Sequence, residues 1–262
     1  MEVDLRVDPF DAPWAQVRDA VRAGVDAGFA GIWTPDHVDG RVFGASRVLE
    51  CWTTLTAIAV STSDVKVGPL VLNVANHHPG VLASMAATLQ DISGGRLLLG
   101  LGAGGGAGAG GGAGAPIRRE QEAIGRPVPP DPVRRAQVEA CVEEMRRLWS
   151  APGFLQPDPA PPVVIAAFGP KMANLAGRIG DGINAPALLP RLREVVAIAR
   201  DACADAGRDP DRFLVTVYSE VHEKWLDGDS PERAELAALG VDRLILYVGP
   251  PFDLALRGVT VR

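Results

Sequence analysis

The chain of 262 residues contains 26 Lys and Arg against 32 Asp and Glu, and 47% of its residues are hydrophobic. The net charge of −6 opposes general binding to nucleic acid, which requires a basic surface. No apolar run approaches the roughly 18 residues of a membrane span, and the three cysteines form no CxxC pair, which indicates neither a zinc site nor a disulfide framework. We therefore expect a cytoplasmic protein that binds neither nucleic acid nor a membrane.

Short strands alternate with longer helices along the whole chain. Runs of β-branched and apolar residues predict eight strands, at residues 3–7, 31–34, 65–72, 96–101, 163–167, 182–184, 212–221 and 243–248. Apolar residues at helical spacing predict helices at residues 14–27, 50–61, 79–92, 133–149, 170–179, 190–206 and 231–239. Eight strands with helical segments between them predict an α/β fold, a single (β/α)8 TIM barrel domain over residues 1–262. A doubly wound sheet is the competing architecture, because alternation alone does not show closure.

Glycine is concentrated directly after the fourth predicted strand. Nine of the 30 glycines lie between Gly102 and Gly114, in a repeat of Gly and Ala. The repeat lacks the GK[ST] ending of a phosphate-binding loop. Its low complexity favours a flexible connector at about residues 102–115 over a phosphate cradle.

Polar residues follow the second and third predicted strands, at the edge where barrels and doubly wound sheets bind ligands. Asp36-His37 is the best catalytic candidate, because an imidazole donates or accepts a proton near neutral pH. A helix cap or a buried hydrogen bond is the alternative role for this pair. His77-His78 precedes Pro79, which favours a cap of the next helix over catalysis. No HxH or HExxH pattern is present, and no metal site is predicted.

The turn after the fifth predicted strand combines features that suit an anionic ligand. Gly169 allows close backbone approach, and Pro170 fits the first turn of a helix. The free N–H groups of that turn, together with Lys171, would bind a phosphate. An ordinary tight strand-to-helix turn is the alternative.

Four segments resemble one known family. They are AGVDAGFAGIWTPDH (residues 23–37), ECWTTLTAIAVSTSDVKVGPLVL (50–72), HPGVLASMAATLQDISGGRLLLGLGAG (78–104) and PVVIAAFGPKMANLAGRIGDGIN (162–184). Together they resemble the bacterial luciferase-like monooxygenase superfamily, and most of all its coenzyme F420-dependent oxidoreductases. The resemblance implies a TIM barrel that binds F420, or FMN as the alternative, at the C-terminal rim. It also implies hydride transfer to or from a small organic substrate, and a homodimer.

The resemblance also assigns roles to residues of this chain. His37 and Asp36 would be the catalytic groups that face the cofactor ring. The segment at residues 70–72 would back the ring, often with a non-proline cis peptide. The implied cofactor contacts are Leu70, Val71, Asn73, Gly102, Gly104, Ala167, Phe168, Gly169, Pro170 and Lys171.

The chain departs from the family where the glycine repeat begins. Gly104-Gly105-Gly106 stands where relatives usually have Trp or Glu, and that glutamate is the proton donor of F420-dependent sugar-phosphate dehydrogenases. Arg41 stands where an aromatic residue is expected, and the segment at residues 220–231 is too short for the usual substrate-covering insertion. A barrel that binds a cofactor without turnover is therefore the second hypothesis.

Overall fold

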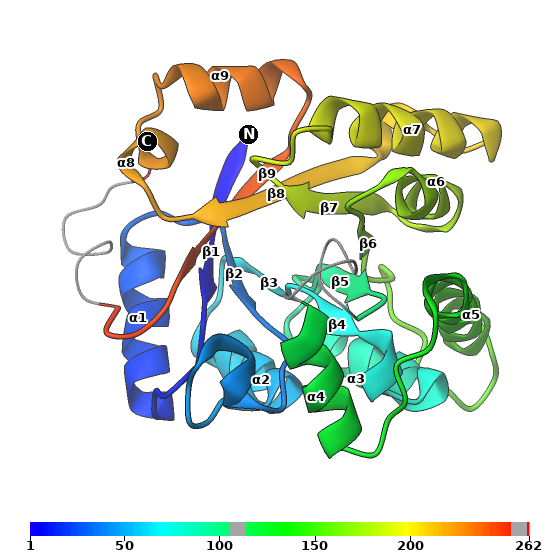
Figure 1. Ribbon diagram of the computed structural model, residues 1–262, viewed down its shortest axis with the longest axis horizontal. Helices are drawn as coiled ribbons and strands as arrows, with labels where there is room; N and C mark the ends of the chain where they lie inside the picture. The colour runs from blue at the N-terminus through cyan, green and yellow to red at the C-terminus, as the bar shows by residue number, and fades with distance from the viewer. Residues whose placement is uncertain (105–113, 253–260, 262) are drawn as a thin grey trace.

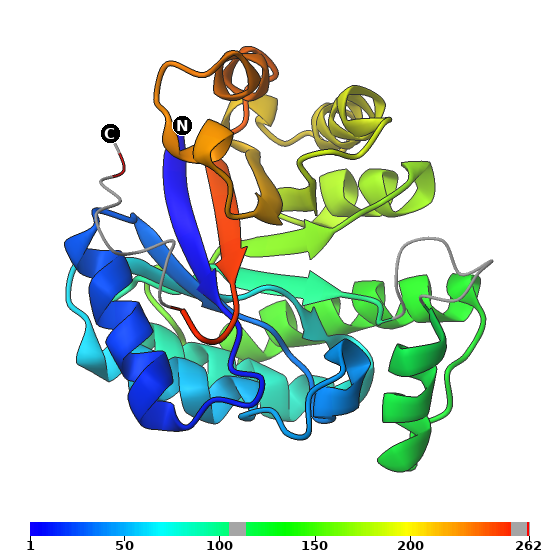
Figure 2. The ribbon, with the colours of Figure 1, turned by 60° about the vertical axis from the view of Figure 1, so that its left-hand side comes forward.

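A computed structural model describes residues 1–104, 114–252 and 261, and its strands form one parallel sheet. The strands are β1 (Glu2–Val7), β2 (Gly31–Thr34), β3 (Lys66–Pro69), β4 (Leu72–Asn73), β5 (Leu99–Gly102), β6 (Val163–Ala166), β7 (Gly182–Pro186), β8 (Leu214–Glu220) and β9 (Arg243–Val248). Their order is β3-β2-β1-β9-β8-β7-β6-β5-β4. The first and last strands are therefore neighbours, as Figure 2 shows for β1 and β9. Strands in this order go once around a barrel.

The third predicted strand, at residues 65–72, consists of two short strands. β3 pairs with β2, whereas β4 pairs with β5 through Leu72 and Leu101. A parallel bridge between Val67 and Leu97 joins β3 to the segment before β5 and nearly closes the barrel. The Leu70–Val71 peptide between β3 and β4 is cis, as the resemblance implied. The TIM barrel prediction is confirmed, and the doubly wound alternative is wrong.

Helices cover the outside of the barrel (Figure 1). The covering helices are α1 (Trp14–Asp26), α2 (Cys51–Ser61), α3 (Pro79–Ile92), α5 (Asp131–Trp149), α6 (Pro170–Ile179), α7 (Leu192–Asp205), α8 (Glu223–Leu226) and α9 (Pro231–Ala238). A further helix, α4 (Gly114–Ala123), lies at the rim of the barrel, and the 3-10 turns are η1 (Gly40–Phe43), η2 (Val74–Asn76) and η3 (Pro210–Arg212). A large apolar core lies between the helices and the strands. A smaller cluster contains Trp33, Leu70, Leu98 and Ile245. No helix in the described part of the chain is long and apolar enough to cross a membrane.

The main difference from the predicted elements is α4. This helix begins at Gly114, inside the loop expected at residues 102–115, and the central part of that loop, residues 105–113, lies outside the described residues. Periodicity did not reveal α4 because its sequence GAPIRREQEA offers a single large apolar residue, Ile117, and no apolar stripe.

A buried ion pair connects β1, β2 and β9. Asp4 is 0% exposed and accepts hydrogen bonds from Arg243 Nε and Nη2, at 2.7 and 2.9 Å. It also accepts a hydrogen bond of 2.8 Å from Trp33 Nε1. A Cβ atom at Gly31 would lie 2.8 Å from this carboxyl group, so glycine at that position leaves room for the pair. The carboxylate thus satisfies donors from two neighbouring strands at once.

We expect Asp4→Asn to destabilise the fold by about 3–5 kcal/mol, because Arg243 stays buried without its counter-charge. Urea unfolding followed by circular dichroism measures the loss. The double variant Asp4→Asn with Arg243→Met removes both charges and should recover most of it. Glu194→Gln, which breaks an exposed pair with Arg191, is the matched control and should change stability by less than about 1 kcal/mol. A single variant as stable as this control would contradict the role of the ion pair.

Candidate active site

A cavity of about 620 Å³ lies at the carboxyl ends of the strands. This volume lies within the usual range for sites that bind small molecules and cofactors. Eleven of the twelve residues singled out from the sequence line it: Asp36, His37, Leu70, Val71, Asn73, Gly102, Gly104, Phe168, Gly169, Pro170 and Lys171. Ala167 is fully buried beside the cavity and Ala166 lines it instead. The topology thus brings together residues that lie far apart in the sequence.

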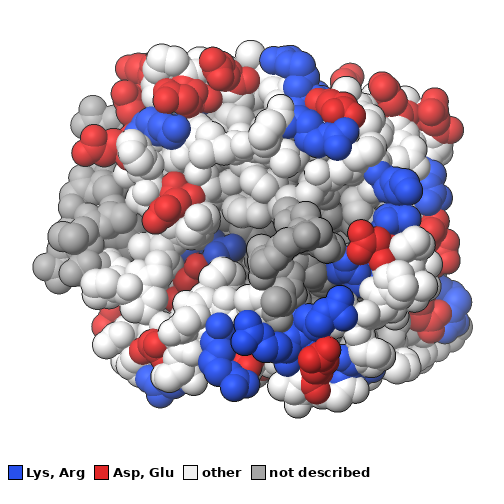
Figure 3. Space-filling view, viewed as in Figure 1, with Lys and Arg blue, Asp and Glu red and all other residues white. Residues whose placement is uncertain are grey.

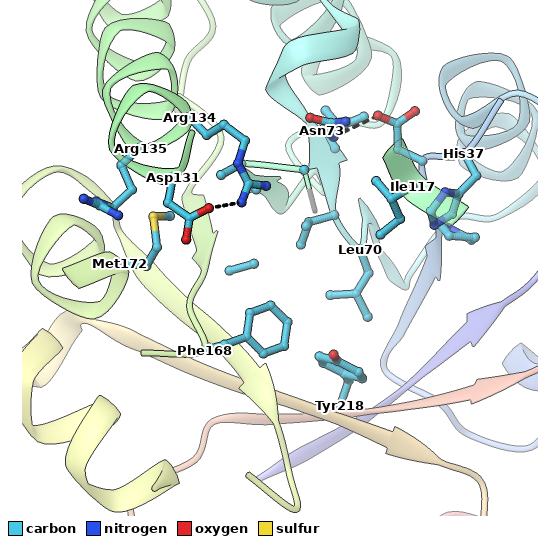
Figure 4. A pocket seen from close by; sticks show the side chains of 18 of the residues that line it. His37, Leu70, Asn73, Ile117, Asp131, Arg134, Arg135, Phe168, Met172 and Tyr218 are labelled. Carbon is cyan, nitrogen blue, oxygen red and sulfur yellow. Dashed lines mark hydrogen bonds and ion pairs between the residues drawn. The ribbon is translucent and has the colours of Figure 1, made fainter. Parts of the chain in front are cut away.

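The cavity has two polar ends and an apolar middle (Figure 4). His37 lies on one side, and Arg134 with Asp131 lies on the other. Leu70 and Phe168 lie between them. A ligand that fills the cavity would therefore meet an acid–base group and a cationic group at opposite ends.

His37 pairs with a carboxylate from α4. Its Nδ1 atom lies 3.1 and 3.3 Å from the two carboxyl oxygens of Glu120, a residue only 2% exposed. The same carboxylate accepts hydrogen bonds from the backbone N–H groups of Val38, at 2.6 Å, and Asp39, at 3.1 Å. The ring of Phe43 meets the imidazole edge-on at 5.2 Å between centroids. The histidine is thereby held on several sides.

Asp36 belongs to a different pair. Its carboxylate accepts a hydrogen bond of 2.9 Å from the backbone N–H of Asn73 and lies 3.1 Å from Nε2 of His77. Asp36 is 5% exposed. Although Asp36 and His37 are adjacent in the sequence, each pairs with a partner from another part of the chain, and Asp36 connects β2 to β4.

Two other histidines cap helices. His78 is the N-cap of α3, where Nδ1 accepts a hydrogen bond from the N–H of Gly80 at 3.2 Å, as the sequence favoured. His222 does the same for α8 through the N–H of Lys224. Within the described residues no group of three or more His, Cys, Asp or Glu could hold a metal ion.

Gly104 leaves the end of β5 in a left-handed conformation, with φ of +63°. A Cβ atom there would collide with the side chain of Asn73. The Oδ1 atom of Asn73 accepts a hydrogen bond from the N–H of Ala75, which holds that side chain in place. A Cβ atom at Gly102 would lie 2.7 Å from Val71. The two glycines therefore keep the rim of the cavity open beside Val71 and Asn73.

The opposite end of the cavity is cationic. Arg134 of α5 is buried, and its Nη2 donates a hydrogen bond of 2.5 Å to Asp131. Its Nε and Nη1 atoms are buried and have no hydrogen-bond partner among the described residues. The hydrogen bond from Arg134 lowers the pKa of Asp131. Arg135 and Lys171 line the same cavity.

The N-terminus of α6 adds positive potential at the cavity. Its N-cap, Gly169, offers no side-chain acceptor, so the first-turn N–H groups of Lys171 and Met172 have no acceptor within the helix. On the outer surface, Lys and Arg side chains gather over α4 beside the central hollow (Figure 3). Cationic side chains thus gather on this face although the net charge of the chain is −6.

Sequence inspection missed several residues that line the cavity, among them Glu120, Arg134 and Tyr218. Glu120 lies in a helix that periodicity did not reveal. Arg134 lies in the helix predicted at residues 133–149, and no feature of the sequence marks it as buried. Tyr218 was within the seventh predicted strand, and the alternation of inward and outward side chains along that strand was the one signal that could have placed it inside.

A parallel barrel with a cavity at the carboxyl ends of its strands has the architecture of a TIM-barrel enzyme. The chain belongs to the luciferase-like monooxygenase family, whose sequence model matches residues 3–253. The resemblance seen in the sequence is thereby confirmed. A 5,10-methylenetetrahydromethanopterin reductase from Archaeoglobus fulgidus is 30% identical over 256 residues, which are 95% of this chain and 72% of that protein. An F420-dependent glucose-6-phosphate dehydrogenase from Amycolatopsis mediterranei is 27% identical over 80% of this chain and 67% of its own length.

Solved structures agree on the fold. An F420-dependent secondary alcohol dehydrogenase in complex with an F420–acetone adduct superposes with a TM-score of 0.78, at 19% identity and full coverage of both chains. A coenzyme F420-dependent tetrahydromethanopterin reductase from Methanopyrus kandleri gives 0.73, also at 19% identity, over 100% of this chain and 97% of that one. At such identities the likeness concerns the fold.

Tyr218 presents a phenol to the cavity between the two polar ends (Figure 4). Burial raises the pKa of Tyr218, and nearby Arg6 lowers it by less. Burial, followed by the charge of Glu220, also raises the pKa of Tyr247. The phenol of Tyr218 is therefore a neutral hydrogen-bond donor at physiological pH.

The chain has two tyrosines, so their ionisation can be followed directly by the ultraviolet absorbance of tyrosinate. We expect both to ionise above the ordinary pKa of about 10 in the folded protein, because burial disfavours the charged phenolate. In the Tyr247→Phe variant, Tyr218 is the one remaining tyrosine, so its ionisation is observed by itself. The urea-unfolded protein is the control, in which tyrosine titrates near 10. A midpoint for Tyr218 at or below that of the unfolded chain would show that its phenol is not desolvated.

Proposed function

We propose that the chain is an oxidoreductase that uses coenzyme F420 as its hydride carrier and acts on a small organic substrate. One observation carries the proposal: the same cavity holds a histidine at one end and, at the other, a buried arginine with two N–H groups that have no partner in the described part of the chain. Relatives named as F420-dependent or as methylenetetrahydromethanopterin reductases support the choice of cofactor.

The residues fit a phosphate-bearing cofactor. The Nε and Nη1 atoms of Arg134 have no acceptor in residues 1–104, 114–252 and 261, and burying such donors costs free energy that a phosphate would recover. The uncapped N-terminus of α6 offers further N–H donors beside Lys171. We propose that Arg134, Gly169, Pro170 and Lys171 hold the phosphate, and that Ala167 supports this turn through the bond from its N–H to Asn184 O, 2.8 Å long.

The remaining lining residues suit a flat aromatic ring. We propose that Leu70, Val71 and Phe168 pack against the ring, and that Gly102 and Gly104 leave the space it needs. Asn73 would offer polar contacts at the edge of the ring.

When bound, F420 would carry the hydride, that is, two electrons and one proton, to or from the substrate. His37 would accept a proton from the substrate at Nε2, or return it in the reverse direction, and Asp36 would keep the end of β4 in place through Asn73 N–H. The apolar walls would keep water from the reacting atoms.

FMN is the alternative cofactor, and monooxygenation is the alternative reaction. Both cofactors carry a phosphate, so the cationic end of the cavity accommodates either. The structural neighbours include a monooxygenase, RslO1 from Streptomyces bottropensis. We favour F420 and hydride transfer because the curated relatives are named as reductases and dehydrogenases.

Three further properties belong to this proposal. The chain would act as one barrel domain, which the continuous order of its strands supports. It would act in the cytoplasm, and the three cysteines, all buried and free, support a reducing compartment. It would form a homodimer, a property that rests on the family resemblance.

Titration with F420 and with FMN, each followed by fluorescence, tests the proposal. We expect F420 to bind more tightly, and reduced F420 to be oxidised in the presence of at least one member of a panel of carbonyl and alkene acceptors. His37→Asn should lower kcat about 10²- to 10⁴-fold with little change in F420 affinity, because it removes the acid–base group. Binding without turnover across the panel would favour a cofactor-binding protein, and binding of neither cofactor would overturn the assignment of the cavity.

Arg134→Ala should weaken F420 binding about 10- to 150-fold, because a hydrogen bond to a charged group contributes about 1.5–3 kcal/mol. Isothermal titration calorimetry at two ionic strengths measures the loss. Arg147→Ala is the matched control: Arg147 lies on the same helix, is exposed and pairs with Glu144. Equal affinities for the two variants would remove Arg134 from the phosphate site.

A further inference from the structure

The environment of Glu120 determines where the proton of His37 lies. One carboxyl oxygen of Glu120 accepts hydrogen bonds from two backbone N–H groups, those of Val38 and Asp39. The other oxygen faces Nδ1 of His37 at 3.1 Å. Because an ionised carboxylate has no hydrogen to donate, the Nδ1 atom must carry the proton of that contact.

We propose that Glu120 is a positioning residue that fixes neutral His37 in its Nδ1–H tautomer and leaves Nε2 as the proton acceptor at the cavity. Within the described residues Nε2 of His37 makes no hydrogen bond, and His37 lines the cavity. The catalytic meaning of this tautomer rests on the proposed function, but the tautomer itself does not.

The other groups around His37 do not compete for its proton. The rings of Phe10 and Phe43 flank the imidazole and offer no conventional donor or acceptor. The nearby charged groups have partners of their own: Asp36 pairs with His77, and Asp39 pairs with Arg41 at 2.6 Å. Among the described residues, Glu120 is therefore the group that sets the tautomer.

The position of α4 makes this contact possible. Gln121, which like Glu120 is 2% exposed, donates a hydrogen bond of 2.7 Å to Asn76 of η2. Two adjacent buried polar side chains thus attach α4 to two different turns of the barrel rim. Glu120 thus supplies a carboxylate to the rim from α4, after the glycine repeat.

Glu120→Gln gives a sharp test, because it keeps the shape of the side chain and changes its hydrogen-bonding pattern. The backbone N–H groups of Val38 and Asp39 are donors, so they require the amide oxygen. The amide NH₂ then takes the place of Oε2, the carboxyl oxygen nearer to Nδ1 of His37 at 3.1 Å, and donates to Nδ1. The amide oxygen takes the place of Oε1, which lies 3.3 Å from Nδ1 and already accepts both backbone bonds. The variant should therefore invert the tautomer and place the proton on Nε2.

Long-range ¹H–¹⁵N NMR correlations of the ligand-free protein, at about pH 9 so that the imidazoles are neutral, report the tautomer. The signals of His37 are identified by their loss in His37→Asn. We expect the Nδ1–H form in the wild type and the Nε2–H form in Glu120→Gln. Gln121→Ala, which removes the neighbouring contact of α4 and keeps the carboxylate, is the matched control and should retain the Nδ1–H form.

A wild-type protein in the Nε2–H form, or a Glu120→Gln variant that keeps the Nδ1–H form, would overturn the proposal. If Glu120→Gln does not fold, Glu120→Ala is the second variant, because it removes the acceptor altogether. An undiminished share of the Nδ1–H form in Glu120→Ala would also overturn the proposal. In turnover assays Glu120→Gln should lower kcat about 10²- to 10⁴-fold while KM stays nearly constant. A wild type without turnover would refute the proposed function and leave the NMR result intact.

Discussion

The division of one barrel strand between Pro69 and Leu72 is the constraint on which the rest of the site depends. β3 pairs on one side with β2, and β4 pairs on the other with β5, so the backbone between them leaves the sheet. Leu70 joins the interior cluster with Trp33, and both Leu70 and Val71 line the cavity. The neighbouring strand must yield space for this detour: a Cβ atom at Gly100 would collide with the carbonyl oxygen of Pro69. The divided strand therefore requires a glycine at position 100 of β5.

The two ends of the cavity follow from different parts of the chain. β2, α4 and the segment around His37 form the acid–base end, whereas the N-termini of α5 and α6 form the cationic end. Helix N-termini carry positive potential whatever the composition of the protein. Arg134 is buried, and the described residues offer it one carboxylate partner, Asp131. An overall negative chain can therefore hold an anionic group, because the field inside a cavity depends on the nearest dipoles and charges rather than on the net charge.

Periodicity predicted the barrel because each strand is a short buried run and each covering helix has an apolar face, and both patterns depend on local sequence. The turn at Gly169 and the cap at His78 were predictable for the same reason. The division of residues 65–72 was not derivable from periodicity, because the whole segment is buried and its apolar run continues across the break. The pairing of His37 with Glu120 was out of reach for another reason. It joins residues 83 positions apart through a helix without an apolar stripe.

The glycine repeat takes on a different meaning in the light of this pairing. From the sequence alone, glycines after the fourth strand indicate a lost side chain and weakened chemistry. In the structure the chain returns after the repeat as α4 and brings a buried carboxylate to the histidine. A carboxylate held by two backbone N–H groups cannot rotate away without breaking both bonds, so it orients the imidazole more firmly than a partner on a freely rotating side chain would. The repeat is then compatible with an intact acid–base group, because the chemistry requires the carboxylate at His37 and not a particular route of the chain to it.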